Sequence, residues 1–204
     1  EADIFSLDYR VAPEHLFPKA VDDAVAGYQW LLDQGYDPKR IVVGGDSAGG
    51  GLALALLLSL KNLGLPMPAG GFLYSPWTDL ATTGESLSAN EKTDALFRKV
   101  HITQGAKRYL GNADPKSPLA SPLYADLSGL PPLQIYASED EILLDDSLRL
   151  QEKLNAAGVQ SELILEKGLA HIWPCFVGRF PEADRDMKRS AEFIRTRLAV
   201  SAPS

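Results

Sequence analysis

Cysteine and basic residues are scarce in this chain. Cysteine occurs once among 204 residues, at Cys175, which excludes a disulfide within the chain and fits a reducing compartment. Lys and Arg number 20 against 27 Asp and Glu, giving a net charge of −7. This charge disfavours nucleic acid or an anionic membrane as the main partner. We expect a cytoplasmic location.

Long apolar runs and common sequence signals are also missing. The longest apolar run, from Leu52, is shorter than the roughly 20 residues that span a bilayer. No signal peptide is visible, and neither Gly-Lys-Ser/Thr nor GxGxxG occurs. Glu1 opens the chain in place of an initiator Met. The composition, 45% hydrophobic and 23% charged, is that of a globular protein, and we expect one domain over residues 1–204.

Hydrophobic periodicity divides the chain into alternating strands and helices. Apolar stretches predict strands at 3–9, 41–43, 70–74, 133–137 and 161–165. Amphipathic or long apolar stretches predict helices at 18–32, 52–62, 145–157 and 182–198. This alternation indicates the α/β class, with a mostly parallel sheet covered by helices on both faces.

An irregular stretch over about 76–132 interrupts the alternation, with one helix expected at 103–110. Long insertions between core elements are usually lids or pocket walls, and the alternative is a solvated excursion. Trp77 and Phe97 within it, and Tyr74 before it, are candidate walls of a pocket. Plain core packing is an equally good interpretation for each of these three side chains.

The Gly45-x-Ser47-x-Gly49 pattern lies between a predicted strand and the apolar helix, as in a nucleophile elbow. A sharp strand-to-helix turn leaves the central residue strained, and small neighbours let the backbone pass. Ser47 would then present its hydroxyl above the sheet edge. The Ala48 N–H, at the positive end of the helix, would stabilise an oxyanion. The alternative is an ordinary Gly-rich turn or a phosphate cradle.

A serine nucleophile needs a base, and the chain holds three histidines. In the Ser, acid, His order of such enzymes, the base follows a late strand. His15 precedes Ser47, and His101 precedes the late strands that could carry the acid. His171 follows the predicted strand 161–165, so we predict that His171 is the base.

The carboxylate that orients this histidine should follow the preceding strand, because active sites of parallel sheets lie at the carboxyl ends of strands. Strand 133–137 is followed by Ser138-Glu139-Asp140-Glu141. We predict that Asp140 is the acid, with Glu139 and Glu141 as alternatives.

Several motifs together resemble the hormone-sensitive-lipase-like esterases, bacterial family IV of the α/β-hydrolases. They are DYRVAPEH at 8–15, GDSAGG at 45–50, SPL at 121–123, LPP at 130–132, SEDEILLDD at 138–146 and AH at 170–171. The resemblance implies an α/β-hydrolase fold, a Ser47–His171–Asp140 triad and no cofactor. It also implies a small-molecule carboxylic ester as substrate, with a short or medium acyl chain, and a homodimer formed through the sheet edge near 161–165.

Two other functions remain open at this point. Residues 171–174 resemble the members that act as lactone hydrolases of the monoterpene lactone type or as acetyl esterases. The alternative of another class is a non-catalytic ligand-binding protein on a hydrolase scaffold. That class usually loses a triad residue, and all three candidates are present here.

One family feature is absent from the sequence. Members carry a His-Gly-Gly-Gly loop upstream of the DYR motif, which supplies most of the oxyanion hole, and no such loop occurs here. We therefore expect an N-terminally truncated hydrolase fold, in which Ala48 is the remaining donor. Losing one oxyanion donor typically costs ~10²–10³ in kcat, so the chain alone should be weakly active or poorly folded.

Overall fold

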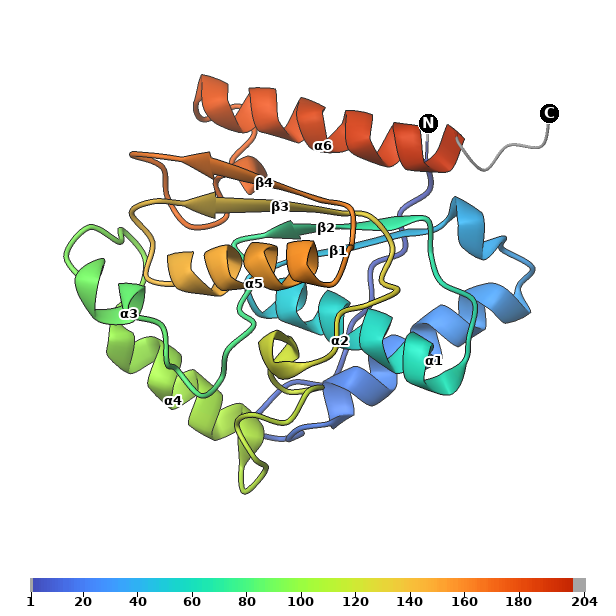
Figure 1. The fold of residues 1–204 in the computed structure, drawn as a ribbon, viewed down its shortest axis with the longest axis horizontal. Coiled ribbons are helices and arrows are strands. Elements are labelled where there is room, and N and C mark those ends of the chain that lie inside the picture. Colours follow the sequence, from blue (N-terminus) through green and yellow to red (C-terminus); the bar gives the residue numbers. More distant parts are fainter. Residues whose placement is uncertain (1, 200–204) are drawn as a thin grey trace.

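The computed structural model describes residues 2–199 and contains one sheet of four parallel strands. Its strands are β1 (Val42–Asp46), β2 (Gly70–Tyr74), β3 (Leu133–Ser138) and β4 (Ser161–Glu166), adjacent in that order. The register pairs Val42 with Gly70, Gly71 with Leu133, and Leu133 with Ser161. Because all four strands run in one direction, their carboxyl ends lie together at one end of the sheet (Figure 1).

Helices cover both faces of the sheet. The long helices are α1 (Lys19–Asp33), α2 (Ala48–Leu63), α5 (Leu144–Ala156) and α6 (Pro181–Ala199). Helix α6 lies on one face, while α2 and α5 lie on the other, and α1 packs against α2 (Figure 1). The shorter elements are α3 (Ser86–Ala89), α4 (Lys99–Leu110) and the 3₁₀ turns Pro38–Arg40, Pro122–Tyr124 and Trp173–Cys175.

The middle of helix α2, residues 50–60, is almost entirely apolar and is buried on nearly all sides. Leu57 is fully buried in the main core with Leu73 of β2 and Ile135 of β3. On its other side, Leu60 packs with Tyr28 of α1 in a second cluster. A helix without a polar face is expected where a sheet and another helix enclose it.

The α/β class, the parallel sheet and the helices on both faces are confirmed, but the predicted strand at 3–9 is wrong. In the structure this stretch has no regular secondary structure. Phe5 stacks on Trp30 at 5.5 Å between ring centroids, and Leu7 packs with the cluster between α1 and α2. Phe5 and Leu7 therefore contact a helix surface while Ile4 is exposed, and no strand of the described residues pairs with this stretch.

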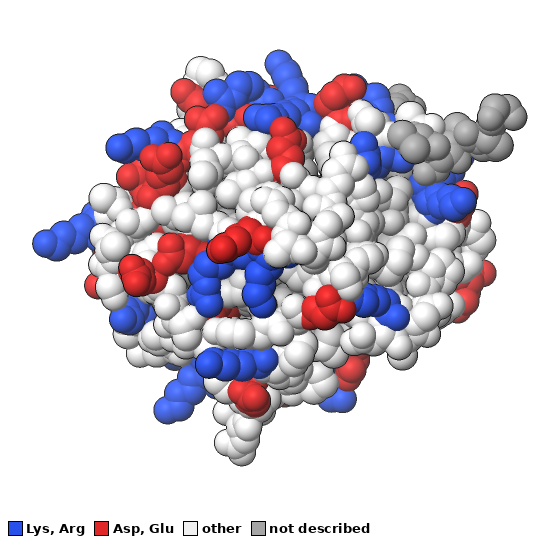
Figure 2. All heavy atoms as spheres, in the orientation of Figure 1, with Lys and Arg blue, Asp and Glu red and all other residues white. Residues whose placement is uncertain are grey.

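Charges are mixed on the surface. Figure 2 shows acidic and basic side chains interspersed over one face rather than gathered by sign. Within residues 2–199, no helix combines the length and the apolarity that crossing a membrane would require.

Candidate active site

The nucleophile elbow forms where β1 passes into α2. Ser47 has φ 52° and ψ −118°, a conformation that residues with a side chain rarely adopt. Its backbone N–H donates to the Tyr74 carbonyl at 2.8 Å, and its carbonyl accepts from the Trp77 N–H at 2.9 Å. Bonds to the end of β2 and to the loop beyond it thus hold the strained turn, as is typical of functional sites.

Gly45 explains the spacing of the elbow motif. A Cβ at Gly45 would lie 2.3 Å from the carbonyl oxygen of Gly49, so only glycine fits there. A Cβ at Gly49 itself would meet nothing within 4 Å. The position two residues before the serine must therefore be glycine, because the Gly49 backbone after the serine packs against Gly45.

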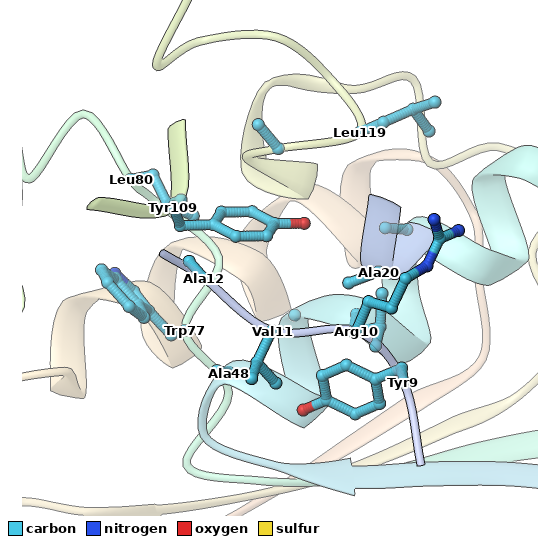
Figure 3. A pocket seen from close by; sticks show the side chains of 14 residues that line it. Tyr9, Arg10, Val11, Ala12, Ala20, Ala48, Trp77, Leu80, Tyr109 and Leu119 are labelled. Carbon is cyan, nitrogen blue, oxygen red and sulfur yellow. The ribbon is translucent and has the colours of Figure 1, made fainter. Parts of the chain in front are cut away.

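A cavity of about 200 Å³ lies beside the elbow (Figure 3). Figure 3 shows Ala48, at the start of α2, with the rings of Tyr9, Trp77 and Tyr109 around it. Its walls are mainly apolar and come from the loop at 9–12, α2, the loop after β2, α4 and residues 119–120. Backbone N–H groups in the first turn of a helix have no intrahelical acceptor, so the Ala48 N–H is suited to bind an oxyanion at this cavity.

Arg10 and Tyr9 are two polar residues of the cavity wall, and each has a defined charge state. Arg10 is paired with Asp23 of α1 at 2.6 Å, and this hydrogen-bonded pair lowers the pKa of Asp23 to about 2. The loop that carries Tyr9 is thereby fixed to α1. Burial, and secondarily the nearby charge of Asp46, raises the pKa of Tyr9, so its hydroxyl stays neutral.

The structure pairs His171 with Glu141 and not with Asp140. His171 Nδ1 lies 2.5 Å from Glu141 Oε2, and both side chains are 1% exposed. The other oxygen of Glu141 accepts a hydrogen bond from the Ser138 N–H at 3.1 Å. The prediction that Asp140 orients the histidine is therefore corrected, and the carboxylate in that position is Glu141, one of the two alternatives.

Asp140 faces the loop that precedes His171. Its Oδ2 accepts a hydrogen bond from the Gly168 N–H at 2.5 Å. The chain turns after β3, so consecutive side chains leave in different directions: Asp140 points to the neighbouring loop and Glu141 points inward. The side chain of Glu139 is exposed, which removes the second alternative from the site.

His171 is held by groups other than Glu141 as well. The next residue, Ile172, donates its backbone N–H to Ser75 Oγ at 2.9 Å, which ties the loop to the end of β2. The Phe97 ring packs edge-on against the imidazole, 5.1 Å between centroids. Nε2, the nitrogen that would take the proton of Ser47, is buried without a hydrogen-bond partner among residues 2–199.

The three aromatic candidates have three different surroundings. Trp77 lines the cavity, which is the pocket-wall interpretation. Tyr74 lies in the core with Tyr136 and Trp173, which is the packing interpretation. Phe97 contacts His171, so it lies at the site but is not among the residues that line the cavity.

A second buried carboxylate, Asp146, holds the loop after β2 that forms part of the cavity wall. Asp146, near the start of α5, accepts from the backbone N–H groups of Thr78 and Asp79 at 2.6 and 2.8 Å. Burial raises the pKa of Asp146 to about 7, although these two hydrogen bonds act in the opposite direction. Asp79 is itself paired with Arg149 at 3.0 Å. This network fixes the loop after β2, which carries Trp77.

No three His, Cys, Asp or Glu side chains of the described residues are grouped so that they could hold a metal ion. What the geometry offers is a strained serine at a helix start, a buried carboxylate–imidazole pair at the same sheet edge, and an adjoining apolar cavity. Such a set of groups can support nucleophilic catalysis on a carbonyl.

Comparison with known proteins gives consistent matches. A family model described as "alpha/beta hydrolase fold" matches residues 1–175. The chain is 40% identical over 195 residues to an acetyl-hydrolase of Streptomyces hygroscopicus, covering 96% of this chain and 65% of that protein. It is 44% identical over 191 residues to an esterase of Acinetobacter venetianus, covering 93% and 63%.

A solved structure is equally similar. The crystal structure of an esterase from the bacterial hormone-sensitive lipase family superposes with a TM-score of 0.92 at 47% identity. The match covers 94% of this chain and 64% of that one. The chain thus spans a little under two thirds of the length of these relatives.

Proposed function

The chain belongs to the alpha/beta hydrolase fold family, and on that premise we propose that the protein hydrolyses carboxylic esters through Ser47, His171 and Glu141. The observation that carries this proposal is the buried Glu141–His171 pair, in which Oε2 and Nδ1 are 2.5 Å apart. The pair lies at the carboxyl end of the sheet, where the strained Ser47 turn also lies. The esterase and acetyl-hydrolase relatives support the same reaction class.

The chemistry follows from the roles of the three side chains. Ser47 Oγ attacks the ester carbonyl carbon, and His171 Nε2 takes the hydroxyl proton as the new C–O bond forms. Glu141 keeps the other imidazole proton on Nδ1 and stabilises the imidazolium. The Ala48 N–H stabilises the negative oxygen of the tetrahedral intermediate.

Collapse of this intermediate breaks the bond to the alcohol, which leaves with the proton from Nε2. The acyl group then remains on Ser47. A water molecule gives its proton to His171 Nε2 and attacks the acyl carbon. The bond between this carbon and Ser47 Oγ then breaks, and Nε2 returns the proton to Oγ, which frees the acid and restores the serine. No cofactor takes part in the sequence of steps proposed here.

The cavity beside Ala48 supports short to medium acyl groups as the substrate class. Its volume is about 200 Å³. An engineered apolar cavity of roughly 150 Å³ binds benzene, so a space slightly larger suits an acyl chain of about the same number of carbons. The relative from Streptomyces hygroscopicus is named an acetyl-hydrolase, at the short end of this range.

A serine-reactive fluorophosphonate tests the proposal without the natural substrate. We expect one adduct by intact mass on the wild-type chain, and none on Ser47→Ala. Ser88→Ala, which changes an exposed serine of α3, is the matched control and should label normally. Labelling of Ser47→Ala at the wild-type rate would contradict the assignment of the nucleophile.

A panel of p-nitrophenyl esters of increasing acyl length, together with a lactone, tests the substrate class. We expect hydrolysis to be fastest with short or medium acyl groups, and to fall by up to ~10⁶ in kcat in Ser47→Ala. A preference for the lactone would favour the lactone hydrolase alternative. If no ester is hydrolysed, the same panel on a longer protein that carries the upstream segment distinguishes a missing segment from a wrong assignment.

We further propose that two copies associate through the edge of β4, which is an outer strand of the sheet. Light scattering after gel filtration would show a dimer mass. A monomer at all concentrations tested would refute this part of the proposal.

A further inference from the structure

We propose that Asp140 is a positioning residue, which holds the loop before His171 so that the imidazole can reach the nucleophile. The inference rests on the proposed function, and it assigns a role to the carboxylate that is not the partner of the histidine. Asp140 acts through the backbone of the loop and does not touch the reacting atoms.

Four consecutive residues, beginning with the last residue of β3, each form a hydrogen bond to the segment 166–171. These bonds join Ser138 Oγ to the Leu169 carbonyl (2.6 Å), Glu139 N to the Glu166 carbonyl (2.8 Å), Asp140 Oδ2 to Gly168 N (2.5 Å) and Glu141 Oε2 to His171 Nδ1 (2.5 Å). The segment 138–141, which carries Glu141, is therefore linked at four successive residues to the segment 166–171, which carries His171. Displacement of either segment displaces the acid–base pair.

Three of these bonds support the Glu141–His171 pair, and the bond from the Asp140 carboxylate is the charged one among them. A hydrogen bond to a carboxylate is roughly twice as strong as one between neutral groups. Gly168 has φ +77°, the left-handed region that favours glycine, so the loop turns at the residue whose N–H the Asp140 carboxylate accepts. Asp140 is itself held, since its N–H donates to Ser138 Oγ at 3.2 Å and its carbonyl accepts from Thr93 Oγ1 at 3.0 Å.

The bond to Glu141 does not fix the imidazole by itself. One hydrogen bond at Nδ1 lets the ring and its loop pivot, and Nε2 is at the far side of the ring. Gly168 lies three residues before His171, and Ser75 holds the residue after it, so the loop is anchored on both sides. Misplacement of a catalytic group by 1 Å can cost about 10²-fold in rate.

The test compares two substitutions at Asp140 with one at its neighbour. Asp140→Ala removes the acceptor at Gly168, whereas Asp140→Asn keeps an oxygen there without the charge. Glu139→Gln changes an exposed side chain and is the control. We expect kcat to fall about 10- to 100-fold in Asp140→Ala with KM unchanged, and to recover to within about threefold of wild type in Asp140→Asn.

Amide hydrogen exchange gives a readout that needs no activity. We expect the Gly168 amide to be protected in the wild type and in Asp140→Asn, and to exchange quickly in Asp140→Ala. The downfield NMR signal of the His171 Nδ1 proton should persist in all variants but broaden in Asp140→Ala. Unchanged Gly168 exchange and an unchanged His171 signal in Asp140→Ala would overturn the inference.

Failure of the two proposals can be told apart. If Asp140→Asn is as inactive as Asp140→Ala although its Gly168 amide stays protected from exchange, the charge is required for another reason and the positioning role is wrong. If Ser47→Ala keeps full esterase activity, the proposed function fails, whatever the Gly168 amide shows. Equal kcat in wild type and Asp140→Ala refutes the positioning role alone.

Discussion

Replacing Glu141 by Gln is the most informative single change, because it tests which of three adjacent carboxylates supports the histidine. The carboxylate accepts on both oxygens, from Ser138 N at 3.1 Å and from His171 Nδ1 at 2.5 Å. A glutamine has one acceptor and one donor at the same two places. One of these two bonds must therefore be lost.

Either orientation of the amide is unfavourable for catalysis. If the amide nitrogen faces His171, Nδ1 must accept, so the proton of the neutral imidazole moves to Nε2. Nε2 then cannot take the proton of Ser47. If the amide oxygen faces His171, two donors meet at Ser138, and a buried unsatisfied donor costs about 1–3 kcal/mol.

The equivalent acid-to-amide change in a serine protease triad lowers kcat about 10⁴-fold, or about 5.5 kcal/mol in the barrier. We expect a loss of this order in Glu141→Gln, measured as kcat on a short p-nitrophenyl ester, with the melting temperature as a check on folding. Glu139→Gln should behave as wild type. A loss near 10⁴ in Asp140→Asn, with Glu141→Gln active, would refute the assignment and restore the original prediction.

Two further predictions concern stability. Gly45→Ala should destabilise the fold by about 3 kcal/mol or more, because its Cβ would lie 2.3 Å from the Gly49 carbonyl oxygen; thermal unfolding by circular dichroism measures this. Gly49→Ala is the matched control and should leave the melting temperature unchanged or raise it, and equal losses in both would contradict the packing argument. Asp146 has a pKa of about 7 in the folded state, above its unfolded value of roughly 3.9, so the folded state binds more protons between these pH values. Its contribution to stability is therefore present at low pH and falls, by up to about 4 kcal/mol, as pH rises from 4 to 7. In Asp146→Asn this fall should disappear in urea titrations at pH 4.5 and 7.5, and an unchanged difference between the two pH values would show that Asp146 titrates normally.

The relation between sequence and structure differs from one element to another. Strand β2 has the predicted bounds, 70–74, since a short apolar run flanked by a turn has few alternatives. The stretch 3–9 is also apolar and forms no strand, because pairing depends on a neighbouring strand and not on the stretch itself. A local apolar pattern thus specifies neither the strand partner nor the burial of a stretch, since Ile4 of this stretch is 93% exposed.

The elbow and the candidate base could both be proposed from the sequence alone. Ser47 is specified by the glycine spacing, and the structure gives a physical cause for the first glycine, since a Cβ at Gly45 would meet the Gly49 carbonyl oxygen. His171 was found because chain order and the carboxyl edge of a parallel sheet leave one histidine in the right place. The argument for His171 needs only the order of the strands along the chain, which the alternation of strands and helices supplies.

The choice among Glu139, Asp140 and Glu141 was decided by the tertiary structure. All three follow the same strand, and their composition and spacing do not distinguish them. Which side chain points inward depends on the direction of the turn after β3, and that turn is fixed by hydrogen bonds to the segment 166–171, far away in sequence. A local pattern carries no information on such long-range contacts, so only the assembled sheet edge places Glu141 on the imidazole and Asp140 on the loop that carries it.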